Sequence, residues 1–494
     1  MRSLAIASCG AVAGAVVALA ARRILLRRLA RLRIRLLGDK AALLAQRRRS
    51  FCPAQSVSYA NTDPLLLVEG HGARLVDEAG RSFLDTRNNV AHVGHAHPAI
   101  AAAVASQAAL LNTNTRYLHP HVCELSRRLL ETMPSPLCDG VTFFVNSGSE
   151  ANDLALRLAR AVHAARHGNG GAGGGRWIVV DHAYHGHTDA VIGLSPYKFE
   201  HRSFGGKGQP AWVTKCPAPD TYRGPHRGAD AGAAYAKYVA DACAGAGADG
   251  VCGFIVESGM SVAGVLVPPE GYLAACYRAV RAAGGVCVAD EVQTGLGRFG
   301  GDVWWAFEQQ RVCPDIVTLG KPFGNGMPLA AVVCTRAVSD AFAAGPEYFN
   351  TFGGNPVCAA AGLAVLDVIH RERLREHAAT VGAALREALQ ALARSAEGAL
   401  IGDVRGVGLF LGIEFVRDRA TLQPATKETS YLCSRLKDVH RILTSIDGPH
   451  DNVIVVKPPM CFSADDARTL VDALTLELRA IGAADLSAAG HTPT

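Results

Sequence analysis

The sequence predicts an α/β protein with a large domain built on a mainly parallel sheet and a smaller α+β domain. Strand-like and helix-like patterns alternate along residues 141–335, as expected for a parallel sheet covered by helices. Apolar residues make up 49% of the 494 residues, enough for a large core. Several of the apolar runs end in acidic, small or basic residues, and open α/β sheets bind their ligands at such strand ends.

Local patterns outside this region predict the remaining elements. Residues 65–85 alternate like a hairpin, residues 363–392 have helical periodicity, and residues 402–414 read as a turn into a strand. The glycine-rich stretch 168–175 indicates a surface loop. We therefore divide the chain into a basic apolar leader (1–50), an N-terminal segment of the small domain (51–110), a large domain (111–365) and a C-terminal small domain (366–494).

Lys321 is the most informative residue of the chain. It follows the apolar run 315–319 and is surrounded by Gly320, Gly324 and Gly326. Loss of water disfavours the ammonium form of a buried lysine, which makes the amine a better imine-former. Taken alone, Lys321 would be interpreted as a surface lysine in a turn. Upstream segments supply the other parts of a cofactor site.

Three upstream segments carry these parts. An apolar strand at 286–289 ends in Asp290, which can pair with a protonated pyridine nitrogen, and Gln293 follows within reach of a phenolic oxygen. A second strand runs into Gly148 and Ser149 at the start of a helix, where free N–H groups and the helix dipole favour a phosphate. In the third, Tyr184 can cover the face of a ring.

Together these segments resemble class III aminotransferases, which are fold-type-I pyridoxal-phosphate enzymes. The resemblance covers roughly residues 55–480 and includes the motifs at 146–152, 184–186, 290–298, 320–321 and 351–356. It implies that Lys321 holds the cofactor aldehyde as an imine, that Asp290 binds the pyridine nitrogen and that Tyr184 stacks on the ring. It also implies that Thr351 reaches the cofactor phosphate of the neighbouring subunit, so the active unit would be a homodimer.

A subgroup of this family, the phospho-lyases of ethanolamine phosphate and 5-phosphohydroxy-L-lysine, is similar over more segments. The stretch 84–98 has a short version with Asn88 and Asn89, where ordinary class III transaminases carry a longer glycine-containing stretch. The segments 111–119, 195–199, 219–225 and 457–463 also look like this subgroup. The implied reaction is β-elimination of phosphate from a phosphorylated amine. An ω-amine or alanine–glyoxylate-type transaminase, and a non-catalytic binding protein on the same fold, are the alternatives.

Substrate contacts are expected from charged residues. Arg405 matches the family arginine that binds a substrate carboxylate, and Glu257 matches a glutamate that can pair with that arginine. The alternative for this pair is a structural ion pair. A phosphate dianion also needs cations in a desolvated site. The candidates are Arg116, Lys198, Arg223 and Lys457, and Asn88 is a further substrate-contact candidate.

Histidines 92, 95 and 97 have a spacing compatible with a metal site. The resembled family needs no metal, however, and Pro98 indicates the start of a helix. We therefore expect no metal.

The leader carries the positive charge of the chain. Residues 1–50 hold 12 Lys or Arg and one acid, a net of +11, so the rest of the chain carries −5 of the total of +6. The remaining body gives no reason to expect nucleic-acid binding. An arginine-rich segment without acids indicates mitochondrial import to the matrix, and the apolar run 4–21 alternatively indicates a membrane anchor. The 14 cysteines lack a Cys-x-x-Cys pair and read as core residues in a reducing compartment.

Overall fold

The computed structural model describes residue 29 and residues 39–55, 57–59, 63–167, 174–199 and 208–481. The apolar run 4–21, nearly all of the basic segment after it, and residues 168–173 of the expected glycine-rich loop lie outside these residues. In the described part of the chain, no helix is long and apolar enough to cross a membrane. The cysteines that can be described are all free thiols.

The described residues form two compact units. The first contains those up to Gly70 together with Leu75–Phe83, and the second contains His71–Arg74 and those from Leu84 onward. Our division at residues 110 and 365 concerns the interior of the second unit and stays a prediction.

The first unit contains helix α2 (Lys40–Ser50), most of strands β1 (Leu67–His71) and β2 (Arg74–Asp77), and the first half of β3 (Ser82–Asp85). The carboxylate of Asp39 caps α2 by accepting a hydrogen bond from the N–H of Ala42 at 2.7 Å. The segment 65–85, expected to be a two-stranded hairpin, contains the three strands β1, β2 and β3.

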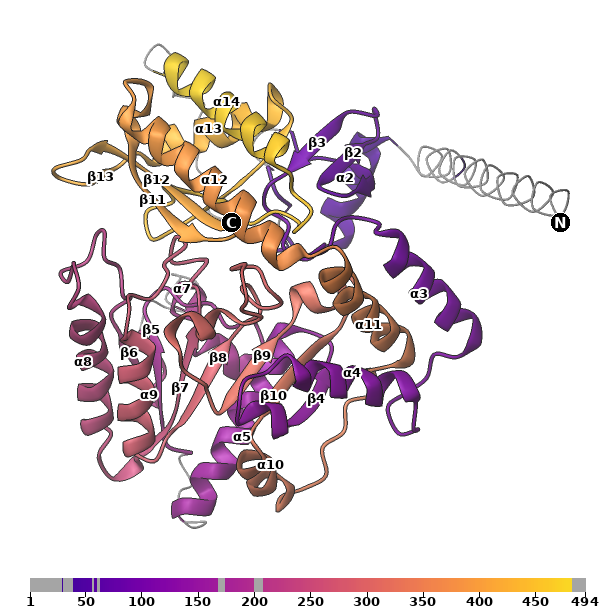
Figure 1. The fold of residues 1–494 in the computed structure, drawn as a ribbon, viewed down its shortest axis with the longest axis vertical. Helices are drawn as coiled ribbons and strands as arrows, with labels where there is room; N and C mark the ends of the chain where they lie inside the picture. Colours follow the sequence, from indigo (N-terminus) through magenta and orange to yellow (C-terminus); the bar gives the residue numbers. More distant parts are fainter. Residues whose placement is uncertain are drawn as a thin grey trace, which may run out of the picture. The chain divides into compact units, whose positions relative to one another are not determined.

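The second unit contains a seven-stranded sheet in the order β4-β10-β9-β8-β7-β5-β6 (Figure 1). Its strands are β4 (Val141–Val145), β5 (Arg176–Val180), β6 (Val213–Cys216), β7 (Val251–Glu257), β8 (Val286–Asp290), β9 (Ile316–Leu319) and β10 (Ala330–Cys334). β10 pairs antiparallel with β9 and β4, while the pairs from β6 to β9 are parallel. The predicted α/β fold with a large, mostly parallel sheet is confirmed.

Helices bury both faces of this sheet. Trp177 and Val179 pack in one apolar cluster with α5 and α10, whereas Ile178 and Val180 pack in another with α8 and α9. This split follows from the two-residue period of a strand. The helices of this part of the chain are α3 (Pro98–Leu110), α4 (Pro120–Glu131), α5 (Gly148–His167), α6 (Asp189–Ile192), α7 (Pro196–Phe199), α8 (Ala231–Ala244), α9 (Tyr272–Ala282), α10 (Arg336–Ala343) and α11 (Pro356–Arg371). Short 3-10 turns are η1 (Leu137–Asp139), η3 (Gly247–Asp249), η4 (Ala306–Gln310) and η5 (Lys321–Gly324).

The C-terminal part has a second sheet, in the order β11-β12-β16-β15, with β13 added to β12. Its elements are α12 (Leu374–Arg394), η6 (Glu397–Leu400), β11 (Ile401–Val407), β12 (Phe410–Asp418), β13 (Gln423–Pro424), α13 (Thr426–Asp438), β14 (Ile442–Leu443), β15 (Ser445–Asp447), β16 (Val453–Val456) and α14 (Ala464–Ala480). β14 pairs in parallel with Leu84 and Asp85 of β3.

Two sequence predictions differ from the structure in this part. The helical periodicity at 363–392 corresponds to two helices, α11 and α12, because Arg373 adopts a left-handed conformation with φ of 51° between them. The turn into a strand expected at 402–414 is a hairpin of two strands, β11 and β12. Gly408 makes the hairpin turn, with φ of 56°.

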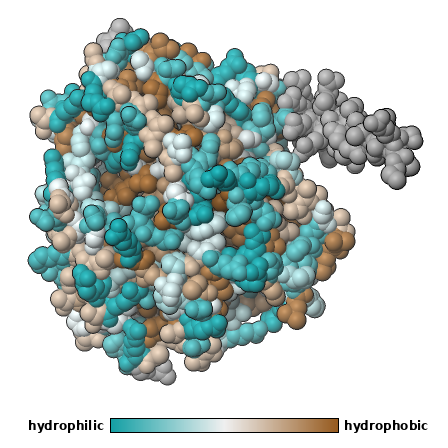
Figure 2. Space-filling model, viewed as in Figure 1, coloured by the Kyte–Doolittle hydropathy of each residue, from teal (hydrophilic) through white to brown (hydrophobic). Residues whose placement is uncertain are grey.

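Hydrophilic side chains cover most of the face shown in Figure 2, and apolar side chains occur there in small groups.

Candidate functional site

A cavity of about 300 Å³ lies at the ends of β4, β8 and β9, between residues of several loops. Its lining includes the sequence-predicted Gly148, Ser149, Tyr184, Asp290, Gln293 and Lys321, together with Val90, Asn146, Ser147, Asn152, His185, Gly186, Val292, Met327 and Leu329. The carboxyl ends of parallel strands meet at one edge of a sheet, which is the usual ligand position in such folds. The structure therefore brings six of the predicted site residues together.

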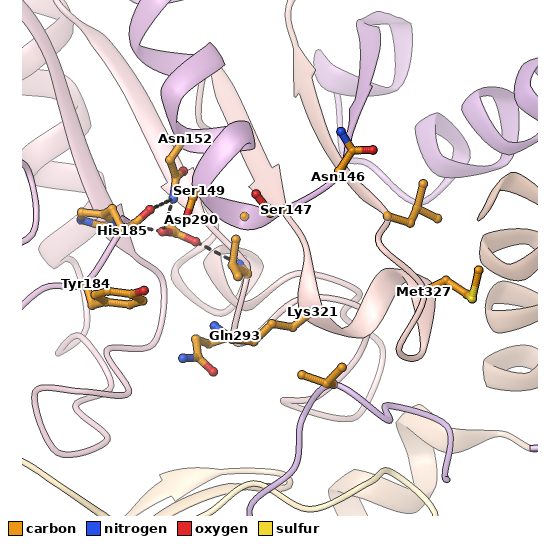
Figure 3. Close-up of a pocket in the computed structure, with 15 residues that line it drawn as sticks. Asn146, Ser147, Ser149, Asn152, Tyr184, His185, Asp290, Gln293, Lys321 and Met327 are labelled. Atoms are coloured by element: carbon orange, nitrogen blue, oxygen red, sulfur yellow. Dashed lines mark hydrogen bonds and ion pairs between the residues drawn. The ribbon is translucent and has the colours of Figure 1, made fainter. Parts of the chain in front are cut away.

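Asp290 is the most constrained side chain of this cavity. It is the last residue of β8, with 2% exposure. Its Oδ2 accepts hydrogen bonds from Nδ1 of His185 and Nδ2 of Asn152, each at 2.8 Å, and its Oδ1 accepts one from the N–H of Val292 at 3.0 Å (Figure 3). A carboxylate offers about four acceptor positions. Among the described residues three are used, which leaves room on Oδ1 for one more donor.

The network around Asp290 extends to two further elements. Asn152 lies near the start of α5, and its Oδ1 accepts a hydrogen bond at 2.7 Å from the hydroxyl of Thr318 on β9. The Nε2 atom of His185 is buried without a partner in the described part of the chain. Because the carboxylate of Asp290 can only accept, the proton of His185 is on Nδ1.

Lys321 opens η5, one residue after Gly320 and two after the end of β9. Desolvation lowers the pKa of its amine, while the nearby carboxylates of Asp290 and Glu257 act in the opposite direction. The net lowering enlarges the neutral fraction, which is the form that attacks a carbonyl.

The start of α5 forms a cradle suited to a phosphate. Gly148 is its first residue, and a side chain there would collide with Val292 at 2.8 Å. Gly186 has φ of 130°, and a Cβ on it would lie 2.5 Å from Oγ of Ser149. Backbone N–H groups at a helix start, without side chains in front of them, bind anions well.

The comparisons with known proteins agree with this geometry. Residues 55–478 match the family described as aminotransferase class-III. The chain belongs to the class III aminotransferase family. A Drosophila melanogaster protein named alanine–glyoxylate aminotransferase 2-like is 48% identical over 417 residues, which is 83% of this chain and 81% of that protein.

Two other similar proteins are named as phospho-lyases rather than as aminotransferases. A Caenorhabditis elegans protein named ethanolamine-phosphate phospho-lyase homolog 1 is 39% identical over 446 residues, 87% of this chain and 92% of that protein. The solved structure of an Arthrobacter phospholyase in complex with phosphoethanolamine has 37% identity and a TM-score of 0.79, and covers 88% of this chain and 99% of that chain.

Membership of the class III family makes pyridoxal phosphate the cofactor, as the sequence predicted. The residues present fit it. The cradle at Gly148 and Ser149 suits the cofactor phosphate, the remaining acceptor position of Asp290 suits a protonated ring nitrogen, and Lys321 suits the aldehyde.

Tyr184 and Gln293 line the same cavity (Figure 3). The N–H of Tyr184 donates to Oε1 of Glu257 at 3.0 Å, and Oε1 of Gln293 accepts a hydrogen bond from Nδ2 of Asn89. The side chain of Asn88 is used locally, because its Oδ1 accepts from the N–H of Val90 at 3.0 Å. Stacking of Tyr184 on the ring and the contact of Gln293 with the ring oxygen stay predictions.

Glu257 and Arg405, which we expected to pair, have other partners in the described structure. Glu257 ends β7 and accepts from the N–H groups of Tyr184 and Ser261, at 3.0 Å and 3.2 Å. Burial raises its pKa to about 7. The guanidinium of Arg405 forms ion pairs with Glu414 at 2.7 Å and Asp403 at 2.9 Å.

The guanidinium of Arg405 also makes two hydrogen bonds. Its Nε and Nη2 atoms donate to the carbonyl oxygen of Gly264, at 2.8 Å and 2.6 Å. Burial alone would lower the pKa of Arg405, but Glu414 and Asp403 outweigh it and the pKa is raised. Glu414 also pairs with Arg223. The expected ion pair between Glu257 and Arg405 is therefore wrong, because Glu414 on the neighbouring strand holds the arginine.

The other predicted contacts lie apart from the cavity lining. Arg116 is exposed, pairs with Glu347 at 3.1 Å and lies over the ring of Phe349 at 4.0 Å. Thr351 is exposed, and its contact with the cofactor of a neighbouring subunit stays a prediction. Lys457 is buried just after β16 and donates to Oγ of Ser261 at 2.7 Å.

The three histidines considered for metal binding have structural partners. His92 bonds to the carbonyl oxygen of Leu296 at 2.8 Å, His95 to Asp85 at 2.7 Å and His97 to the N–H of Ala99 at 3.2 Å, where it caps α3 at Pro98. No group of three potential ligands for a metal ion occurs among the described residues.

Sequence reasoning missed His185, Asn152 and Thr318. The first two stand inside the motifs at 184–186 and 146–152, so their place was visible, but their shared contact with Asp290 depends on the fold. Asp447 and Arg87, which approach Lys457, had no recognisable signal because neither belongs to a catalytic pattern.

Gly186→Ala tests the cradle. A Cβ at this position meets Oγ and Cα of Ser149 at 2.5 Å and 2.8 Å, so we expect the cofactor dissociation constant to rise at least about tenfold, equivalent to ~1.4 kcal/mol. The measurement is a titration of apoenzyme with pyridoxal phosphate. Gly271→Ala is the matched control, since Gly271 also has a positive φ, of 76°, but nothing within 4 Å of its Cβ. Equal cofactor affinities of the two variants would contradict the assignment.

Proposed function

We propose that this class III enzyme is a phospho-lyase that eliminates phosphate from a phosphorylated amine, either ethanolamine phosphate or 5-phosphohydroxy-L-lysine. The products would be an aldehyde, ammonia and phosphate. The observation that carries the proposal is that Arg405 already has partners. Its guanidinium is bound by Glu414, Asp403 and the carbonyl of Gly264. A transaminase of α-keto acids needs an arginine available for the substrate carboxylate, and here two carboxylates already hold it.

Two of the relatives support this choice. The Caenorhabditis elegans protein is named a homologue of ethanolamine-phosphate phospho-lyase, and the Arthrobacter phospholyase was solved with phosphoethanolamine bound. The similarity to this chain covers nine-tenths or more of the length of each of these two proteins. Their shared substrate unit is an amine and a phosphate on adjacent carbons.

Lys321 performs the proton transfers in this proposal. Pyridoxal phosphate, when bound, supplies an aldehyde for the substrate amine and a ring that accepts the electron pair released at the adjacent carbon. The neutral amine of Lys321 removes the proton from the carbon that bears the substrate nitrogen, and the lowering of its pKa by burial favours this base form. Asp290 keeps the ring nitrogen protonated, with His185 and Asn152 fixing the carboxylate.

The elimination balances without an oxidant. The carbon–hydrogen bond beside nitrogen and the carbon–oxygen bond to phosphate break, and a carbon–carbon double bond forms. Addition of one water to the released unsaturated amine gives the aldehyde and ammonia. Ethanolamine phosphate would give acetaldehyde, ammonia and inorganic phosphate.

The second candidate is an ω-amine or alanine–glyoxylate-type transaminase. The observation that favours it is the 48% identity to the Drosophila melanogaster protein with an aminotransferase name. Lys321, Asp290 and the cradle would serve both reactions equally, so the choice depends on whether the substrate carries a leaving group.

The enzyme would act as a homodimer. Two segments, 110–118 and 347–352, lie side by side, since Thr115 donates to the carbonyl of Asn350 at 2.7 Å and Arg116 pairs with Glu347. They expose large apolar side chains: Leu110, Leu111, Tyr117, Leu118, Phe349 and Phe352, of which Leu118 is 97% exposed. An apolar surface of this kind is typical of an interface. Thr351 lies within it, as a residue shared between subunits must.

We expect sedimentation of the holoenzyme to give the mass of a dimer. Leu118→Asp should shift the protein to monomer because a charge cannot be desolvated in the interface. A wild-type protein that sediments as a stable monomer at micromolar concentration would refute the shared site.

The leader would direct the chain to the mitochondrial matrix. Its support is the acid-free arginine segment that precedes Asp39. A fluorescent fusion of the whole chain should colocalise with a matrix marker, and deletion of residues 1–38 should release it. A fusion that stays in the cytosol with the leader intact would refute import.

Purified enzyme with pyridoxal phosphate should release phosphate and ammonia in equal amounts from one of the two phosphorylated amines. Lys321→Ala should lower this rate by at least about 10³-fold, because the base and the imine-forming amine are lost together. Coupled assays for both products provide the measurement, with Lys237→Met, an exposed substitution on α8, as the control. Full activity of Lys321→Ala would contradict the assigned role.

A further inference from the structure

Three basic side chains from separate parts of the chain interact electrostatically with one carboxylate. Arg87 follows β3, Lys198 lies on α7 and Lys457 follows β16. Each interacts electrostatically with Asp447, the last residue of β15. The nearest measured approach is 3.9 Å, from Nζ of Lys457 to Oδ2 of Asp447.

Lys457 has unused hydrogen-bond donors in the described structure. Its side chain is about nine-tenths buried, and its ammonium has three N–H donors. In the described structure Nζ has one hydrogen-bond acceptor, the hydroxyl of Ser261 at 2.7 Å, and Asp447 lies beyond hydrogen-bond distance. A buried ammonium with unused donors is costly unless an anion completes it.

The surroundings hold Lys457 in place. The N–H of Lys457 donates to the carbonyl of Thr86, next to Arg87, at 2.8 Å. The buried guanidinium of Arg298 donates to the carbonyl of Pro458 at 2.8 Å. The segment that carries Lys457 is therefore fixed by backbone contacts, and the ammonium has a defined position.

The cations exceed the anions in this cluster. Arg87, Lys198 and Lys457 interact electrostatically with Asp447, and Asp451 interacts with both Lys198 and Asp447. Burial lowers the pKa of Lys457 to about 8, so the ammonium is still mostly charged at pH 7. A dianion entering the cluster would gain the unused N–H donors and the excess of positive charge.

The cluster lies within reach of the catalytic lysine. Both Asp447 and Lys457 interact electrostatically with Lys321. Ser261 adds a structural link, because its hydroxyl binds Lys457 and its N–H binds Glu257 beside the cavity. In the two substrate candidates four covalent bonds separate the reacting nitrogen from phosphorus, so phosphate must bind close to Lys321.

We propose that Arg87, Lys198 and Lys457 form the binding site for the phosphate group of the substrate, with Asp447 keeping the three cations together. This inference rests on the proposed phospho-lyase function. Among the sequence candidates, Lys198 and Lys457 interact with Asp447, whereas Arg223 pairs with Glu414 and Arg116 pairs with Glu347. Both substrate candidates contain the same aminoethyl phosphate unit, so this site selects the phosphate and leaves the remainder of the substrate to other contacts.

The first test is binding of inorganic phosphate to holoenzyme saturated with pyridoxal phosphate, so that the cofactor cradle is filled. Equilibrium dialysis with labelled phosphate gives the dissociation constant. Lys457→Met keeps the length of the side chain and removes its charge, and we expect phosphate to bind at least about tenfold more weakly. Lys457→Arg should recover most of the affinity. Lys237→Met, on the exposed surface of α8, is the matched charge-removal control and should leave phosphate binding unchanged.

The second test is kinetic. In Lys457→Met and Arg87→Met the KM for the phosphorylated amine should rise more than kcat falls, while the absorbance of the bound cofactor stays that of wild type. Arg87→Met also keeps the test decisive if Lys457→Met fails to fold. Wild-type holoenzyme that binds no phosphate, or variants with wild-type phosphate affinity and KM, would overturn the inference.

The outcomes separate this inference from the proposed function. Phosphate binding that depends on Lys457, without elimination from either amine, would remove the lyase and keep the anion site. Elimination with an unchanged KM in both variants would keep the lyase and remove the anion site.

Discussion

The hydrogen-bond network of Asp290 is the constraint on which the rest of the site depends. One buried carboxylate joins β8 to His185, which neighbours Tyr184, and to Asn152, which lies on α5 four residues after Gly148. Asn152 in turn accepts from Thr318, three residues before Lys321. A buried carboxylate must have its acceptors filled, so these segments cannot shift independently. The phosphate cradle, the ring-nitrogen partner and the catalytic lysine are thereby held in one geometry.

The charges around Arg405 differ from those around Lys457. At Arg405 the positive charge is cancelled by Glu414 and Asp403, so this arginine is a poor receptor for a carboxylate. At Lys457 an ammonium is buried with donors to spare. Both features favour a substrate that brings a phosphate rather than a carboxylate to the site. The same catalytic groups would then break a carbon–oxygen bond to phosphate instead of transferring nitrogen.

The sequence was most informative where a residue with a chemical role directly follows a predicted strand. Lys321, Asp290 and the start of α5 follow apolar strands directly, so both the fold and their meeting place could be predicted from the order of the motifs. Leu319 and Lys321 are separated only by Gly320, and no tertiary knowledge is needed to place them. The break between α11 and α12 was missed, because helical periodicity continues across Arg373 and only its left-handed conformation ends the helix.

Partners of charged side chains were not predictable in the same way. Arg405 finds Glu414 because the hairpin turn at Gly408 sets a register in which Asp403 lies opposite Glu414. The sequence offered Glu257 as an equally acidic partner, and nothing local distinguishes the two. The approach of Arg87, Lys198 and Lys457 to Asp447 likewise depends on four separate elements.

The most direct test of the account is the fate of one substrate under competition. Holoenzyme is given a phosphorylated amine together with pyruvate, and phosphorus NMR follows the phosphate ester while alanine is quantified in the same sample. A phospho-lyase converts the ester signal to that of inorganic phosphate and forms no alanine. Alanine formed while the carbon–oxygen–phosphorus linkage stays intact would contradict it and make this protein a transaminase.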